Sequence, residues 1–344
     1  MASIIAGLKL SLLMTNMPHL PALQMSPHSF PKRGRLLTIP PAGPIDLAFV
    51  ESSGSASATA CTTLLIHGLD SSSHTWRGVQ ESLPTPSVAI DCRGCGRSAL
   101  GDPSDFSPDS IVDDIKRLVD GHPLLGDKKF VIVGHSMGGR IGMCYTAKYP
   151  GDVAGLVIED MDIRRRSVQS NFIPNFDEEK AISFDRHQYS MDNLRSAFCD
   201  IGYPLDMIEK WIGEGRVYTV DEGGEEEHKD KGTYAWSEVN PAFRALCYRT
   251  IFDSESGTEA WSAIFNHMKG KDTDEIALHL MVAGIGTVCD EASIDDMTET
   301  MGDLLTVKTY PEGTHSIHNS ARDEFLSDLK EVILGASVQK REGN

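Results

Sequence analysis

Short apolar runs alternate with amphipathic segments along most of the chain. Runs rich in β-branched residues and bounded by Gly, Pro or polar residues are typical of buried strands, and apolar positions at helical spacing are typical of helices. Strands are predicted at 45–50, 61–66, 87–90, 131–133, 153–160, 276–284 and 304–310, and helices at 75–83, 111–119, 140–149, 294–301 and 322–334. This alternation predicts an α/β fold, in which helices cover both faces of a mostly parallel central sheet.

The pattern changes between residues 163 and 275. Short helical stretches stand at 191–198, 205–212 and 241–252, together with an acidic, Gly-rich loop at 221–231, and no alternation of strands and helices is visible. An insertion of this size between two strands of a parallel sheet is typical of a helical lid. The predicted organisation is a disordered or targeting segment at 1–40, a core at 41–163, a helical lid at 164–275 and a second core part at 276–338.

One segment joins a strand to a helix through a serine flanked by glycines. The strand at 131–133 meets Gly134-His-Ser136-Met-Gly138, and the helix at 140–149 follows directly. This G-x-S-x-G context is that of a nucleophile elbow, a sharp turn that presents the serine hydroxyl above a helix N-terminus. Gly134 and Gly138 leave room for the turn because they have no Cβ. The pentapeptide alone is equally compatible with an ordinary Gly-rich turn, so other motifs have to decide.

The strand at 61–66 ends in a second such motif. His67 and Gly68 follow the strand, and Leu69 and Asp70 lead through three serines into the helix at 75–83. Because the carboxyl ends of parallel strands meet at one edge of the sheet, we expect the backbone N–H of Leu69 to point toward Ser136. The alternative is an ordinary turn in which His67 is a structural residue.

Composition narrows the class of protein. The chain has 344 residues, 40% of them apolar and 24% charged, which is typical of a globular protein with a large core. The formal net charge of −18 argues against nucleic acid as a partner, because a phosphate-binding surface needs a concentration of Lys and Arg. The apolar stretch at 4–14 is interrupted by Lys9 and is too short to span a bilayer, so no transmembrane segment is expected.

The number and placement of the cysteines are typical of reduced, buried thiols rather than of disulfides. There are seven, an odd number, and several lie inside apolar runs rather than in a spaced disulfide framework. Cys92 and Cys95 form a C-x-x-C pair, but no second pair follows and the pair does not stand between a strand and a helix. A redox or zinc role is therefore disfavoured, and we interpret the loop at 91–98, with Asp91, Arg93 and its glycines, as a braced structural turn.

The N-terminal segment has an unusual charge pattern. Residues 1–45 contain no Asp or Glu but include Lys9, Lys32, Arg33 and Arg35. A basic, Ser-bearing, acid-free segment is typical of a transit peptide, which predicts a mitochondrion or a plastid as the location. A secretory signal and an untargeted tail on a cytoplasmic protein are the alternatives.

Four motifs together resemble the α/β-hydrolase superfamily. They are His67-Gly68, Asp91-x-Arg93-Gly94-x-Gly96-x-Ser98, Gly134-His-Ser136-Met-Gly138-Gly139 and Gly313-Thr-His315. Within the superfamily, the chain looks most like the group of small bacterial and mitochondrial acyl-esterases that includes the ABHD11-type hydrolases. The resemblance implies an α/β-hydrolase fold, acyl-transfer chemistry, and no metal or organic cofactor.

The resemblance also implies roles for individual residues. Ser136 would be the nucleophile and His315 the base that takes its proton. The backbone N–H groups of Leu69 and Met137 would hold the oxyanion, in a substrate-binding loop shared with His67 and Gly68. His318 is a competing base, but His315 is preferred because it directly follows a strand and a Gly-Thr pair. His135 is expected beneath the serine as a structural residue.

The sequence does not settle which acidic residue completes the expected Ser-His-Asp triad with Ser136 and His315. In many relatives it follows the strand before the last helix, but Thr287 stands there and Asp290 lies further along. In the acyl-esterase group it ends the strand after the elbow helix, where Asp160 stands. We expect Asp160 to be the acid, with Asp290 and Asp162 as alternatives.

These residues predict a serine hydrolase acting on carboxylic esters. The substrate would be a small molecule, an acyl lipid, small ester or acyl thioester, with an apolar acyl chain. Ser136 argues against dehalogenases and epoxide hydrolases, which use Asp as the nucleophile. Two alternatives stay open on the same fold: a triad-bearing ligand receptor with little turnover, and a hydrolase or lyase of pigment esters such as chlorophyll, suggested by a plastid location.

Overall fold

The structure is a computed structural model that describes residues 24–25, 43–54, 61–167, 173–221, 233–270 and 276–342. Most of the segment expected to carry a targeting signal lies outside these ranges, as does most of the acidic loop at 221–231. Among the helices in the described ranges, none combines the length and the hydropathy needed to cross a bilayer.

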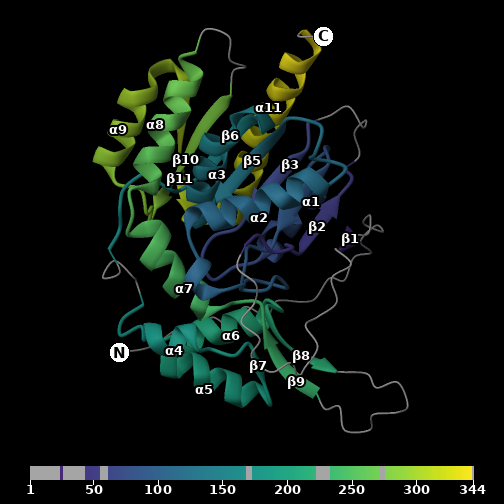
Figure 1. Cartoon of the computed structure of the whole chain (residues 1–344), viewed down its shortest axis with the longest axis vertical. Helices are drawn as coiled ribbons and strands as arrows, with labels where there is room; N and C mark the ends of the chain where they lie inside the picture. Colours follow the sequence, from purple (N-terminus) through teal and green to yellow (C-terminus); the bar gives the residue numbers. More distant parts are fainter. Residues whose placement is uncertain are drawn as a thin grey trace, which may run out of the picture.

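A central sheet of eight strands organises the chain (Figure 1). Its order is β1-β2-β4-β3-β5-β6-β10-β11, and all neighbours from β4 to β11 pair in parallel, whereas β1 and β2 pair antiparallel at one edge. The strands are β1 (Gln24–Met25), β2 (Phe49–Ser52), β3 (Thr63–Ile66), β4 (Ser87–Ile90), β5 (Phe130–His135), β6 (Val153–Glu159), β10 (Ala277–Ile285) and β11 (Leu305–Thr314). The prediction of an α/β fold with a mostly parallel sheet is confirmed.

Helices cover both faces of the sheet, as predicted. They are α1 (Arg77–Ser82), α2 (Pro108–Gly121), α3 (Met137–Lys148), α8 (Ser256–Met268), α9 (Glu291–Met301), α10 (Ile317–Ser320) and α11 (Arg322–Glu342). Successive strand residues point to opposite faces. Leu64 therefore packs in the core under α2, α3, α8 and α9, whereas Leu65 packs in the core under α1 and α11.

The register of the strands sets which residues meet at the carboxyl edge. His135 at the end of β5 lies beside Glu159 at the end of β6, and Met281 of β10 lies on the other side of Glu159. Ile66, the last residue of β3, lies beside Gly134 of β5. The loops that follow β3, β5, β6 and β10 are thereby brought to one edge.

The last helix differs from its prediction. It was expected to end at Gly335, but α11 continues to Glu342. No atom outside the helix lies within 4 Å of a Cβ built at Gly335, so this glycine sits in an open helix position rather than at a cap. A glycine there weakens a helix by about 1 kcal/mol without breaking it.

The insertion between β6 and β10 contains helices and also a small sheet. The helices are α4 (Glu178–Ile182), α5 (Met191–Ile201), α6 (Leu205–Gly213) and α7 (Pro241–Cys247), the last continued by a π-helical turn at Tyr248–Phe252. Three strands pair antiparallel in the order β7 (His187–Gln188), β9 (Thr233–Ser237) and β8 (Val217–Asp221). The sequence pattern did not predict this sheet.

The outer lobe of the insertion, defined here as α4–α6 with β7–β9, has its own core. Leu194, Phe198, Ile208, Trp211 and Ala235 belong to an apolar cluster separate from those of the central sheet. In Figure 1 this lobe lies below the central sheet, with α7 between the two. Helix α8, although inside the range 164–275, packs against α3 and shares the core of the central sheet.

Candidate active site

Ser136 occupies a strained turn between β5 and α3. Its backbone has φ +52° and ψ −122°, a conformation that is costly for a residue with a side chain. A Cβ at Gly134 would lie 2.2 Å from the Gly138 carbonyl oxygen, and one at Gly138 would lie 2.3 Å from the Ile66 carbonyl oxygen. Both glycines are therefore required by backbone packing, as expected for an elbow.

The surroundings of Ser136 leave its hydroxyl available. The residue is buried, with 7% of it exposed, and its backbone N–H donates to Glu159 O at 2.8 Å. Within the described ranges the Ser136 hydroxyl makes no hydrogen bond. Met137 is the first residue of α3, and the N–H groups of Gly139 and Arg140 donate to Ser136 O at 2.8 and 3.3 Å. Among the described residues the Met137 N–H has no such partner, so a free backbone donor lies next to the Ser136 hydroxyl.

His315 and Asp160 form a direct pair. His315 Nδ1 lies 2.7 Å from Asp160 Oδ2, with the Asp160 side chain fully buried and the His315 side chain 34% exposed. A carboxylate only accepts, so Nδ1 carries the proton and Nε2 of the neutral ring keeps a free lone pair. The exposed imidazole can therefore accept a proton at Nε2.

Asp160 is held by four donors. Besides His315, it accepts from the Thr287 hydroxyl at 2.5 Å and from the backbone N–H groups of Ala283 at 3.0 Å and Val288 at 3.1 Å. Burial by itself would raise the pKa of Asp160, but the hydrogen bonds from His315, Thr287 and Ala283 outweigh it and lower the pKa below its ordinary value. Asp160 is therefore a carboxylate near neutral pH.

The two alternative acids have other partners. Asp290 caps α9 and pairs with Arg164 at 2.6 Å. Asp162 pairs with Arg166 at 2.8 Å and accepts the N–H of Asp290 at 3.0 Å. Of the three acids that the sequence left open, Asp160 is the one that contacts His315.

The competing base, His318, is buried, and both of its ring nitrogens have hydrogen-bond partners. Its Nδ1 and its backbone N–H both lie 2.8 Å from Glu159 Oε1, and its Nε2 lies 2.8 Å from the Thr75 hydroxyl. Burial by itself would raise the pKa of Glu159, but the adjacent His318 and its hydrogen bonds lower it. Sequence reasoning missed Glu159, although a carboxylate at the end of an otherwise apolar strand was a visible signal.

His135 lies between these two histidines. Its ring centroid is 4.8 Å from that of His315 and 5.1 Å from that of His318. Burial lowers the pKa of His135 to about 3, so the ring is neutral. This fits the structural role predicted for it.

The loop after β3 lies directly against the elbow. A Cβ at Gly68 would be 3.2 Å from Ser136 Cβ. His67 Nδ1 donates to Gly68 O at 2.7 Å, and its Nε2 accepts the N–H of Cys92 at 3.1 Å. Because the Gly68 carbonyl and the Leu69 N–H belong to one planar trans peptide, this bond points the Leu69 N–H away from the His67 ring.

The contacts of His67 favour the alternative in which it is a structural residue. It was grouped with the oxyanion and substrate-binding residues, but both ring nitrogens are occupied by backbone groups. The ring therefore has no hydrogen-bonding atom left for a substrate. Its hydrogen bond to Gly68 O fixes the Gly68–Leu69 peptide.

The cysteines are not part of the site. Each of the seven is a thiol rather than half of a disulfide, and burial raises the pKa of the Cys92 and Cys95 thiols. Across the described ranges, no three His, Cys, Asp or Glu side chains come together in a way that could hold a metal ion. The loop at 91–98 is braced instead by Arg93, which pairs with buried Asp114 at 2.6 Å.

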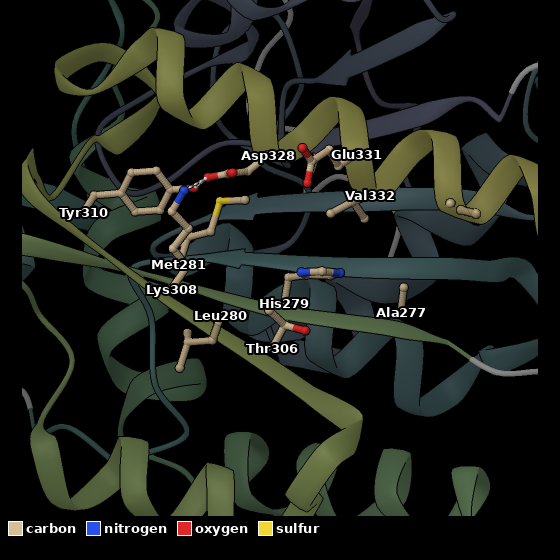
Figure 2. Close-up of a pocket in the computed structure, with 12 residues that line it drawn as sticks. Ala277, His279, Leu280, Met281, Thr306, Lys308, Tyr310, Asp328, Glu331 and Val332 are labelled. Carbon is tan, nitrogen blue, oxygen red and sulfur yellow. Dashed lines mark hydrogen bonds and ion pairs between the residues drawn. The ribbon is translucent and has the colours of Figure 1, made fainter.

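Two cavities lie outside the immediate site. One, of about 410 Å³, lies between β10, β11 and α11 (Figure 2). His279, Asp328 and Glu331 line it, and neither Ser136 nor His315 does. The other, of about 810 Å³, is lined by residues 164–167, Tyr248 and the 288–290 segment, next to the loop that holds Asp160. Its lining carries three arginines and three aspartates, so it is not an apolar acyl pocket.

Comparisons with known proteins agree with the fold. Residues 64–193 match the family model described as alpha/beta hydrolase fold. Among solved structures, an esterase described as from a marine microorganism matches with a TM-score of 0.60 and 19% identity, covering 84% of this chain and 99% of that one. A thioesterase domain from the curacin biosynthetic pathway matches with a TM-score of 0.54 and 17% identity, covering 91% and 100%. The chain therefore has the α/β-hydrolase fold.

More specific relatives match over shorter stretches. Protein phosphatase methylesterase 1 of Candida albicans is 33% identical over 124 residues, 34% of this chain and 34% of the relative. Lipase LipV of Mycobacterium tuberculosis is 37% identical over 98 residues, 28% and 36% of the two chains. The sn-1-specific diacylglycerol lipase ABHD11 of Danio rerio is 28% identical over 135 residues, 38% and 40% of the two chains. The matched stretches thus span only about a third of the first relatives' length.

Proposed function

We propose that the protein is a serine hydrolase that cleaves carboxylic esters through an acyl-enzyme on Ser136. The observation that carries this proposal is the pair of His315 and buried Asp160, 2.7 Å apart, at the same sheet edge as a strained elbow serine. This is the arrangement that acyl transfer to a serine requires.

In the proposed reaction Ser136 Oγ attacks the acyl carbonyl while His315 Nε2 takes the hydroxyl proton. Asp160 accepts the Nδ1 proton in a hydrogen bond and stabilises the imidazolium. The tetrahedral intermediate collapses as Nε2 gives the proton to the leaving alcohol or thiol. Water then attacks the acyl-enzyme with the same base, releasing the acid and restoring Ser136.

The backbone N–H groups of Leu69 and Met137 are the proposed oxyanion donors. Gly68 brings the first against the elbow, and α3 begins with the second. Loss of one such donor typically costs about 10²–10³ in rate.

The relatives support the substrate class. A lipase, a methylesterase and a diacylglycerol lipase are among the matched proteins, and an esterase and a thioesterase domain share the fold. We therefore propose a small-molecule ester or thioester with an apolar acyl chain as the substrate. The acid-free segment at 1–45 supports the further proposal of a mitochondrial or plastid location.

Covalent labelling tests the proposal. The full chain is treated with a fluorophosphonate probe, with the Ser136→Ala variant as the control, and separate, unlabelled samples of both are assayed on p-nitrophenyl esters of increasing chain length. The expected results are labelling that depends on Ser136 and, in the unlabelled wild type, a burst followed by steady turnover. Labelling without turnover would indicate a ligand receptor, and no labelling would exclude the serine mechanism.

A further inference from the structure

Asp70, in the loop after β3, is gripped by three residues of the insertion. Arg244 of α7 contacts Asp70 Oδ2 with Nε at 2.9 Å and Nη2 at 2.6 Å. The Tyr203 hydroxyl donates to Oδ1 at 3.0 Å, and Arg216 Nη2 donates to the Asp70 backbone carbonyl. Arg244 and Tyr203 are 1% and 2% exposed, so these contacts are shielded from water.

Asp70, the residue that these contacts hold, has a strained backbone and a charged side chain. Asp70 has φ +50°, a left-handed conformation that is costly for a residue with a Cβ. A buried carboxylate also needs a partner, because desolvation penalises its charge. Burial by itself would lower the pKa of Arg244, but the charge of Asp70 raises it above its ordinary value. Both the conformation and the charge of Asp70 are thus maintained by residues outside its own loop.

Asp70 directly follows Leu69, whose N–H is a proposed oxyanion donor, so the contacts that hold Asp70 bear on the proposed oxyanion site. Leu69 lies between Gly68, which touches the elbow, and Asp70. On the Gly68 side, the peptide carrying the Leu69 N–H is fixed by His67. On the other side, the residue next to Leu69 is fixed by Arg244, Tyr203 and Arg216. The direction of the Leu69 N–H therefore depends on both anchors.

We infer that Arg244 is a positioning residue for the oxyanion site, acting through its ion pair with Asp70, in which Nε and Nη2 both contact Oδ2. The inference rests on the proposed ester hydrolysis and extends the oxyanion site to a residue of the insertion. Arg244 holds the loop conformation that aims the Leu69 N–H, and it neutralises the carboxylate of the residue that follows Leu69.

The competing explanation is that Arg244 only fastens the insertion to the core. Arg186 offers a matched comparison, because it is a second arginine of the insertion that binds core loops. It donates to Gly96 O at 2.8 Å and to Ser98 O at 2.9 Å, and its guanidinium stacks 4.4 Å from the Trp236 ring centroid. It has no contact with Asp70 within the described ranges.

The test compares Arg244→Lys, Tyr203→Phe and Arg186→Lys in the full chain on a p-nitrophenyl ester and on the matching thionoester. Sulfur is larger than oxygen and a poor hydrogen-bond acceptor, so the thionoester gains little from oxyanion donors. For Arg244→Lys we expect kcat on the oxygen ester to fall by about 10- to 100-fold with KM within about twofold. The oxygen-ester to thionoester rate ratio should fall with it.

The other two variants complete the design. Tyr203→Phe keeps the ring in place and removes one bond to Asp70, so it should lower the same ratio by about 3- to 10-fold, and it covers a failure of Arg244→Lys to fold. Arg186→Lys should change kcat by less than about twofold and leave the ratio unchanged. Equal losses on both esters, or a ratio unchanged in both Arg244→Lys and Tyr203→Phe, would overturn the inference. A wild-type chain that is not acylated at Ser136 would refute the proposed function instead.

Discussion

His135 Nε2 donates a hydrogen bond to the main-chain oxygen of His315 at 2.9 Å. The residue before the candidate nucleophile thus holds the backbone of the candidate base. Three residues further on, His318 is fixed to Glu159, the residue before Asp160. The loop that carries His315 is therefore tied to both strands whose next residues, Ser136 and Asp160, are its proposed partners.

The choice of acid can be tested with two isosteric variants. Asp160→Asn should lower kcat by about 10⁴-fold, because an amide at this position can donate to Nδ1 and favours the wrong tautomer of His315. Asp290→Asn should stay near the wild-type rate, because Asn also caps helices and Asp290 does not contact His315. The measurement is kcat on a p-nitrophenyl ester. Normal turnover in Asp160→Asn together with a loss in Asp290→Asn would reverse the assignment.

The assignment of His315 rather than His318 as the base can be tested, because the two substitutions should affect activity and stability differently. His315→Gln should abolish acylation, a loss of at least about 10⁴-fold, with little change in the thermal midpoint, because the side chain is 34% exposed. His318→Gln should lower the free energy of unfolding by about 1–3 kcal/mol, since it disturbs the buried pair with Glu159, and should keep acylation within about tenfold. Fluorophosphonate labelling rates and thermal unfolding check both variants. The opposite pattern would make His318 the base.

Burial of His135 predicts a pH dependence of stability. Its pKa in the folded chain is about 3, below the ordinary value of 6.5. Between these values the unfolded chain binds a proton that the folded chain does not, so His135 stabilises the fold fully above about pH 6.5. This contribution is lost as the pH falls toward 3, by up to about 1.4 kcal/mol per pH unit.

The His135→Gln variant isolates that contribution. Its free energy of unfolding in urea, measured at pH 7, 6 and 5, should fall less steeply with decreasing pH than that of the wild type. Equal slopes in the two proteins would mean that the folded chain accommodates a charged ring at this position.

The elbow and the core elements could be predicted because local sequence determines them. The backbone at Ser136 needs room that only Gly134 and Gly138 leave, and buried strands show as apolar runs. The acid could not be settled in this way. Asp160 reaches His315 because β6 pairs with β10, where the Asp160 N–H donates to Met281 O at 2.8 Å, and such a register is invisible in a single sequence.

The insertion was predicted less well than the core. Strands β7, β8 and β9 are two to five residues long, and short strands give too few positions for a period to be recognised. The ion pair of Arg244 with Asp70 joins residues 174 positions apart, so no local sequence pattern predicts it. Helix α8 lies inside the predicted lid range, but its apolar face meets α3, which only the packing reveals.

Two glycines that look alike in sequence should respond to alanine in opposite ways. A methyl group at Gly138 would lie 2.3 Å from the Ile66 carbonyl oxygen. Relieving this clash would move the elbow away from β3, and therefore Ser136 away from Leu69. Gly138→Ala should therefore lower the thermal midpoint and abolish labelling of Ser136. Gly335 lies within α11 with nothing within 4 Å of a built Cβ, so Gly335→Ala should raise the free energy of unfolding by about 0.5–1 kcal/mol and leave kcat unchanged. Thermal unfolding of both variants checks the pair, and destabilisation by Gly335→Ala would show that α11 ends near residue 335, as the sequence had predicted.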